Sequence, residues 1–168
     1  PMKKVGVKWK PTYPNWGLLD FKTLKEIKPE DLILIKPSEQ SWLQTVLEKH
    51  NGFPTIQNLW KIMDEIWEEF DCDPTKLDSR VHNFYSHPVW LLNGLFIEQH
   101  KESITNRKIF TKWVSEQNPK RIADYGGGFG GLARMIANLC TDADVEVIEP
   151  HPHPLAIERV KNFSNLSY

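Results

Sequence analysis

The stretch RIADYGGGFGGLARMIANL, residues 121–139, decides the fold class of this chain. It opens with RIADY, a short apolar run that predicts a strand, and closes with a helical pattern whose apolar side chains share one face. Between the two stand five of the nine glycines of the chain, all within residues 126–131. Because each glycine is costly to order, this concentration indicates a turn where the backbone closely approaches a ligand.

The residues that follow repeat the alternation of strand and helix. DVEVIEP (144–150) predicts a second strand, HPLAIERVKNF (153–163) a second helix, and NLSY (165–168) the start of a third strand. The order β-α-β-α-β is typical of a parallel sheet with right-handed crossovers. Such sheets bind ligands at the carboxyl ends of their strands, so the glycine loop and Glu149 are expected at one edge.

Residues 1–118 have a different sequence pattern, which predicts a mostly helical N-terminal or cap region, separate from residues 119–168. Two runs near its start, VGVKW (5–9) and DLILIK (31–36), are candidates for short strands. Helices are expected over residues 39–50, 54–70, 74–85, 88–100 and 102–117. Ser38, Asp73 and Ser86 are the expected N-cap residues of the first, third and fourth of these helices.

The clearest helix, near residues 54–70, carries one apolar stripe. Its members recur at three- and four-residue steps: Ile56, Leu59, Trp60, Met63, Ile66, Trp67 and Phe70. The stripe predicts a helix face packed into the core. An alternative is that the helical region is a non-catalytic binding or assembly module, in which Trp60 and Trp67 contribute to an interface.

Composition narrows the classes of protein. The 168 residues hold 21 basic and 22 acidic side chains, and this balance gives no support to a general binder of nucleic acid or anionic membranes. Cys72 and Cys140 lie far apart with no CxxC spacing, which favours a reducing compartment without disulfides or a zinc site. No apolar run approaches the roughly 18 residues of a membrane span, and no signal-peptide pattern follows the N-terminus, so a cytoplasmic location is predicted.

The glycine loop fits two classes of cofactor. Read as GxGxxG, it matches the dinucleotide fingerprint of an NAD(P)-dependent oxidoreductase with Gly126, Gly128 and Gly131. Read as DxGxGxG, it adds a carboxylate and uses Asp124, Gly126, Gly128 and Gly130. A pyrophosphate close to Asp124 would be repelled, whereas S-adenosyl-L-methionine has a sulfonium and an ammonium group and no phosphate. Asp124 therefore favours the second cofactor.

At this point the sequence resembles a known family. IADYGGGFGGLARMIA (122–137) followed by VEVIEP (145–150) is similar to motifs I and II of class I S-adenosylmethionine-dependent methyltransferases, over residues 120–163. The resemblance implies a Rossmann-like methyltransferase sheet preceded by the helical region. The sheet of that family has further strands beyond the third, so the chain is expected to be the N-terminal part of such an enzyme, apparently truncated and with little activity by itself.

The resemblance also implies roles for individual residues. Asp124 would lie near the methionine end of the cofactor, Glu149 would hold the ribose, and Pro150 or His151 would flank the adenine. Gly126, Gly128 and Gly130 would line the surface where the backbone of the loop contacts the cofactor.

No catalytic residue or metal ligand can be named from the sequence. Methyl transfer depends mainly on positioning, and a base is needed only for acidic nucleophiles such as hydroxyls. His82 and His87 lie among aromatic residues, where a cap helix could cover the cofactor, but packing or capping roles are the commoner use of histidine. The HxH pair at 151 and 153 has too few neighbouring ligands for a metal. The expected acceptor is a small molecule or sugar-type metabolite.

A last expectation concerns the sheet edge. In the predicted strand order 3-2-1, the strand at 121–125 is an open edge without lysine or a bulge to protect it. We expect this edge to pair with another chain, which would give a homo-oligomer, or with the chain's own N-terminal segment, VGVKW or DLILI.

Overall fold

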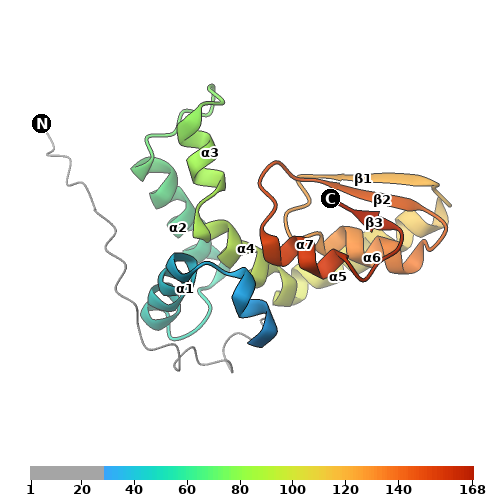
Figure 1. Cartoon of the computed structure of the whole chain (residues 1–168), viewed down its shortest axis with the longest axis horizontal. Coiled ribbons are helices and arrows are strands. Elements are labelled where there is room, and N and C mark those ends of the chain that lie inside the picture. Colours follow the sequence, from blue (N-terminus) through green and yellow to red (C-terminus); the bar gives the residue numbers. More distant parts are fainter. Residues whose placement is uncertain (1–28) are drawn as a thin grey trace, which may run out of the picture.

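The structure, a computed structural model, describes residues 29–168 and shows a mixed α/β fold (Figure 1). Its helices are the 3-10 helix η1 (Pro29–Leu34), α1 (Pro37–Lys49), α2 (Ile56–Glu69), α3 (Ser79–Tyr85), α4 (Pro88–Gln99), α5 (Lys101–Glu116), α6 (Gly131–Leu139) and α7 (Pro154–Val160). Its strands are β1 (Arg121–Tyr125), β2 (Asp144–Ile148) and β3 (Leu166–Ser167). We call η1 to α4 the helical region and α5 to β3 the sheet region.

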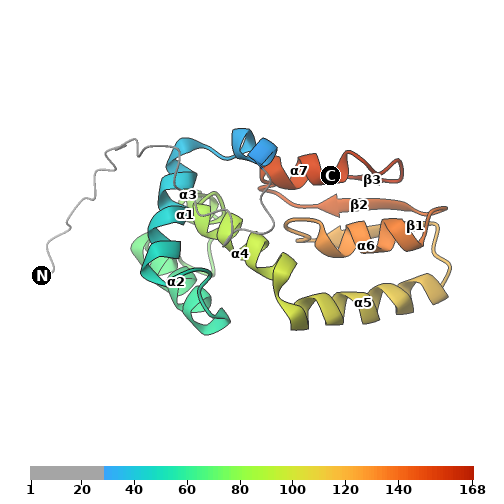
Figure 2. The same ribbon diagram turned by 90° about the horizontal axis from the view of Figure 1, so that it is seen from below.

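The sheet region confirms the predicted parallel β-α-β-α-β order. Its three strands lie in the order β1-β2-β3, with Arg121 opposite Asp144 and Val145 opposite Leu166. The helices α5, α6 and α7 run along one face of this sheet (Figures 1 and 2). Because successive side chains of a strand point to opposite faces, Val145 is buried toward the helices, whereas Tyr125 on the other face of the sheet is 77% exposed.

The β1 edge of the sheet is not covered by DLILI. Residues 31–34 belong to η1, and the backbone N–H of Ile35 donates to Leu32 O at 3.2 Å. The side chain of Gln40 donates to both Leu32 O and Ile35 O, which satisfies the carbonyl groups of this turn. Ile35 is 2% exposed, whereas Ile33 is 89% exposed, so the apolar run docks through part of its side chains rather than as a strand. The segment VGVKW lies outside the described residues.

The helical region is built around α4. Val89, Leu92 and Leu95 of this helix are each 0% exposed, because α1, α2 and α3 surround it. The predicted stripe of α2 is confirmed as core at Leu59 and Ile66, but Trp60 is 56% exposed. Within residues 29–168, no helix is both long and apolar enough to cross a membrane.

The predicted start of α3 is wrong. Asp73 does not cap a helix; its Oδ1 accepts the backbone N–H of Thr75 at 2.9 Å in a local turn. The helix begins at Ser79, after Asp78 has accepted the backbone N–H of Arg80 at 2.9 Å. Asp73 and Asp78, five residues apart, are thus both suitable N-cap residues, and it is Asp78 that caps the helix.

The predicted caps of α1 and α4 are each displaced by one or two residues. Lys36, not Ser38, is the N-cap of α1, and its backbone N–H donates to the Glu39 carboxylate at 2.7 Å. His87, not Ser86, is the N-cap of α4, and its Nδ1 accepts the backbone N–H of Val89 at 3.1 Å. The Ser86 hydroxyl lies instead 3.4 Å from His151 Nδ1.

A buried ion cluster joins the two regions. The carboxylate of Glu98 on α4 pairs with Arg134 of α6 and Arg159 of α7, and its side chain is only 6% exposed. Beside it, the ring of Phe129 packs directly on Gly94, where an added Cβ would lie 2.2 Å from the ring. The helical and sheet regions therefore meet through both charge and close packing.

Candidate functional site

The glycine loop links β1 to α6 through a series of left-handed backbone conformations. Gly126, Gly128 and Gly130 have φ values of 67°, 54° and 63°, a range that side chains of other residues disfavour. The N–H of Gly126 donates to Ile148 O at 2.8 Å, so the loop leaves the sheet directly at the end of β1. The predicted need for glycine is thus met at these three positions.

Gly127 is needed for a different reason. Its φ is not positive, but an added Cβ would lie 2.8 Å from Val147 Cγ1 and 2.9 Å from the carboxyl group of Asp124. The loop consequently lies against the ends of β1 and β2 with no space for a side chain beneath it. The predicted close approach of backbone is therefore made first to the protein's own strands.

Asp124 lies under this loop with one carboxylate oxygen unsatisfied. Its Oδ2 is buried and makes no hydrogen bond, while the backbone N–H of Ala133 favours the charged form. Burial raises the pKa of Asp124, and this effect outweighs that hydrogen bond. A cationic group in the adjacent cavity would lower the cost of holding this charge.

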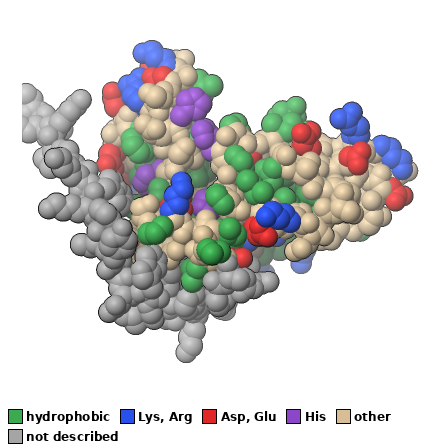
Figure 3. Space-filling view, in the orientation of Figure 1, with side chains coloured by type: hydrophobic (Ala, Val, Ile, Leu, Met, Phe, Trp, Pro, Cys, Tyr) green, Lys and Arg blue, Asp and Glu red, His purple; other side chains and the backbone are tan. Residues whose placement is uncertain are grey.

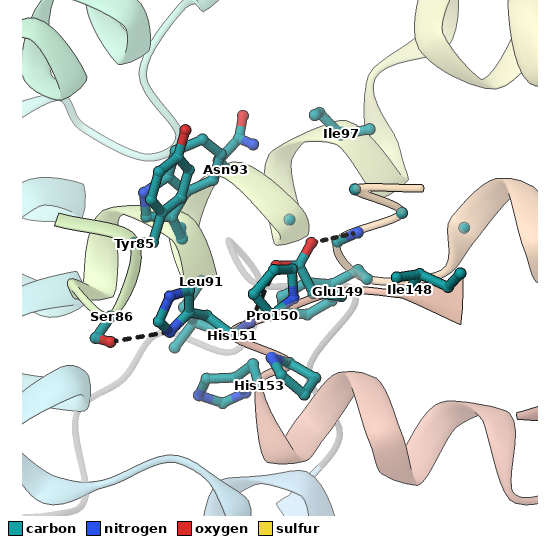
Figure 4. A pocket seen from close by; sticks show the side chains of 18 of the residues that line it. Tyr85, Ser86, Leu91, Asn93, Ile97, Ile148, Glu149, Pro150, His151 and His153 are labelled. Carbon is teal, nitrogen blue, oxygen red and sulfur yellow. Dashed lines mark hydrogen bonds between the residues drawn. The ribbon is translucent and has the colours of Figure 1, made fainter. Parts of the chain in front are cut away.

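Glu149 follows β2 and reaches back to the loop (Figure 4). Its Oε2 accepts the backbone N–H of Gly128 at 3.1 Å, and its Oε1 accepts the backbone N–H of His151 at 3.1 Å. Glycine loop and acid, separated by about twenty residues in the sequence, are therefore in direct contact, as the parallel topology predicts.

Tyr168 is a loop contact that sequence reasoning missed. Its hydroxyl donates to Gly128 O at 2.7 Å, so both polar groups of residue 128 are held. Burial raises the pKa of Tyr168, and the nearby carboxylates of Glu149 and Asp124 add to the rise. A tyrosine at the end of an expected third strand is the only sequence signal for this contact, since the strand ends converge.

A cavity of about 1000 Å³ opens above the loop between the helical and sheet regions, and it lies at the upper end of the roughly 300–1,000 Å³ of small-molecule sites. Residues of both regions line it, including Tyr85, Trp90, Asn93, Gly94, Ile97, Arg107, Asp124, Gly126, Gly128, Glu149, Pro150 and His151. Gly130 is instead buried at the start of α6, where an added Cβ would lie 3.3 Å from the Tyr168 hydroxyl.

Histidines and aromatic rings form one end of this cavity, and Figure 3 shows histidine side chains on the corresponding face. His82 Nδ1 and His151 Nε2 are 3.2 Å apart, and His151 Nδ1 lies 3.4 Å from Ser86 Oγ. The rings of Tyr85 and His151 are nearly parallel at 6.1 Å, and Trp90 stacks on Tyr85 at 5.0 Å. This end therefore presents flat surfaces with polar edges to a ligand.

His87 and His153, the other histidines considered in the sequence analysis, have local structural roles. Burial lowers the pKa of His87, the N-cap of α4, to about 4, so its ring is neutral. His153 caps α7, and its Nε2 lies 3.4 Å from Glu39 Oε2. The HxH residues thus face different partners, and in the described part of the chain no three histidine, cysteine or acidic side chains form a metal-binding group.

Comparisons with protein-family models, with curated proteins and with solved structures found no match for this chain. The site combines a glycine-rich loop, a carboxylate with a buried oxygen beneath it, a second carboxylate against it, and a large cavity with an aromatic end.

Proposed function

We propose that this protein binds S-adenosyl-L-methionine and acts as a methyltransferase on a small molecule or sugar-type metabolite. One observation carries the proposal: Asp124, the glycine loop and Glu149 line a single cavity at the carboxyl ends of β1 and β2. In this proposal the parallel sheet is of the Rossmann-like methyltransferase type, and the helical region covers the cofactor.

Each part of the cofactor has a matching part of the cavity. A carboxylate at the end of the second strand can accept hydrogen bonds from both hydroxyls of a ribose, which is the role proposed for Glu149. The adenine would lie toward Pro150, His151 and Tyr85, where flat rings line the cavity. The methionine end would lie over the loop near Asp124, whose charge favours an ammonium or sulfonium group.

The competing function is that of an NAD(P)-dependent oxidoreductase. The first turn of α6 has free backbone N–H groups beside the glycine loop, and such a turn also attracts a pyrophosphate. The buried carboxylate of Asp124 opposes this alternative, because it would lie close to two phosphate charges in a poorly solvated site.

Isothermal titration calorimetry with S-adenosylhomocysteine on the 168-residue chain tests the proposal. The variant Glu149→Ala should bind about ten- to a hundredfold more weakly, because a ribose loses hydrogen bonds to a charged acceptor. The matched control is Glu146→Ala on the exposed face of β2, which should bind like the wild type. Equal affinity of Glu149→Ala and wild type would refute the ribose assignment, and binding of NADH without S-adenosylhomocysteine would favour the oxidoreductase.

A further inference from the structure

An arginine that the glycine motif does not include lies at the start of α6. Arg107 belongs to α5 and lines the cavity, and its Nη1 stands 2.2 Å from where a Cβ on Gly131 would be. Gly131 therefore admits this guanidinium at its observed position, from which a larger residue would displace it. The arginine is brought to the glycine loop by the packing of α5 along α6 (Figure 2).

Two hydrogen bonds fix the orientation of Arg107. Its Nη2 donates to Ile97 O at 2.7 Å, and its Nε donates to Ser103 O at 3.3 Å. A guanidinium has five N–H donors in one plane, so these bonds leave donors over, including those of Nη1. The side chain is thus held in place on one side while Nη1 stays at the first turn of α6.

The charge of Arg107 is not balanced by an acid within residues 29–168. Burial alone lowers the pKa of Arg107, with no contribution from a neighbouring carboxylate. The other buried arginines of this part of the molecule, Arg134 and Arg159, share the carboxylate of Glu98. A half-buried guanidinium that faces a cavity without a counter-charge favours an anionic ligand there.

The first turn of α6 adds backbone donors beside Arg107. The first intrahelical bond runs from Arg134 N to Gly130 O at 2.8 Å, so the N–H groups of Gly131 and Leu132 precede the helical ladder. Both residues line the cavity. The next N–H, that of Ala133, faces Asp124. One helix turn is therefore flanked by a carboxylate on one side and a guanidinium on the other.

This arrangement suits a zwitterion. We propose that Arg107, together with the N–H groups of Gly131 and Leu132, binds the α-carboxylate of the cofactor's amino-acid end, while Asp124 attracts its ammonium group. The inference rests on the proposed function and names the residue that recognises the methionine moiety. A carboxylate is a planar bidentate acceptor with a single charge, which one guanidinium can match.

The test compares two ligands that differ only in this moiety. S-adenosylhomocysteine carries the amino-acid end, whereas 5′-methylthioadenosine keeps the adenosine and the thioether and lacks it. Calorimetry on the full chain should show that Arg107→Ala weakens S-adenosylhomocysteine about ten- to a hundredfold and leaves 5′-methylthioadenosine unchanged. Arg107→Lys should retain part of the affinity. The exposed neighbour Lys108 provides the control Lys108→Ala, which should bind both ligands like the wild type.

The outcomes separate this inference from the proposed function. Unchanged binding of S-adenosylhomocysteine by Arg107→Ala overturns the carboxylate assignment while the methyltransferase proposal stands. An equal loss for both ligands also overturns it, because Arg107 would then act only on the shape of the site. If the wild type binds neither ligand, or binds NADH in their place through Arg107, both the proposed function and the carboxylate assignment fail.

Discussion

The helical region and the sheet region differ in where their polar side chains lie: Glu39 and Gln40 are buried within the helical region, whereas polar groups of the sheet region gather at the ends of its strands. In the helical region α4 is enclosed by apolar contacts, and Leu92 and Leu95 are completely buried. In the sheet region the strands are short, and half-buried polar groups gather where they end: Asp124 has a buried oxygen without a hydrogen bond, and Glu149 and Tyr168 hold the glycine loop. One region thus supplies most of the stabilising core, and the other holds polar groups that are costly to bury beside the cavity.

The difference does not make the two regions independent. Phe129 of the glycine loop and Leu155 of α7 belong to the apolar core that α4 organises. Glu98 extends from that helix to two arginines of the sheet region. The helical core therefore helps to hold in place the polar groups at the end of the sheet, including the partly unsatisfied Asp124.

The largest effect is expected from removing the ion cluster. Glu98→Ala removes the buried carboxylate that Arg134 and Arg159 share, and breaking a buried ion pair in this way costs about 3–5 kcal/mol. Chemical denaturation followed by circular dichroism should show this loss of unfolding free energy. The exposed residue Glu68 of α2 supplies the control Glu68→Ala, which should unfold like the wild type. Wild-type stability of Glu98→Ala would show that the two regions are joined by packing alone.

A smaller effect is expected within the glycine loop, where two neighbouring glycines differ. Gly128 has a φ of 54° with nothing within 4 Å of an added Cβ, so Gly128→Ala should cost only backbone strain, about 1–2 kcal/mol. Gly127→Ala should cost more, because its Cβ would meet Val147 and Asp124 at under 3 Å. Unfolding free energies of the two variants check this order, and the reverse order would contradict the described seating of the loop on the strands.

The smallest effect is expected in the pH dependence of stability. Burial raises the pKa of Asp124 in the folded protein, so the folded state binds this proton more tightly than the unfolded state. Stability is therefore lost as pH rises from the ordinary carboxyl range through the raised pKa. Asp124→Asn avoids this loss, so the ligand-free variant should be more stable than the wild type at pH about 7, and the advantage should shrink toward pH about 4.

Urea titrations at several pH values check this prediction. The exposed residue Asp144 at the start of β2 gives the matched control Asp144→Asn, for which no such pH-dependent advantage is expected. A constant difference between Asp124→Asn and wild type across the range would show that the buried carboxylate does not titrate with folding. Asp124→Asn should also lose affinity for S-adenosylhomocysteine. This result would show that the carboxylate that lowers stability also binds the ligand.

Much of the fold could be predicted because the periodicities are local. The strands, α6 and α7 follow from apolar runs separated by glycine and proline, and α2 follows from its stripe. The errors occur where two residues compete for one role, as with Asp73 and Asp78 at the start of α3. The run at 31–36 has the composition of a strand, but residues 31–34 belong to η1, which packs against the helical core.

The site could be predicted in part, for the same reason. Asp124, the glycines and Glu149 form a pattern of spacing, and the parallel topology places them at one edge. Arg107 and Tyr168 could not be found in this way, because their roles depend on how α5 packs along α6 and on where β3 ends. Contacts between elements far apart in the sequence need the packing itself.

The aromatic end of the cavity has an optical consequence. Trp90 stacks on Tyr85, which in turn lies parallel to His151, and all three residues line the cavity. The fluorescence emission of an indole changes when a ligand's flat ring replaces water beside it. Trp90 is therefore an intrinsic fluorophore in the wall of the cavity. The other tryptophans of the described residues, at 42, 60, 67 and 113, are not among the cavity's lining and give a constant background. The protein thus carries its own reporter of whether the cavity is filled.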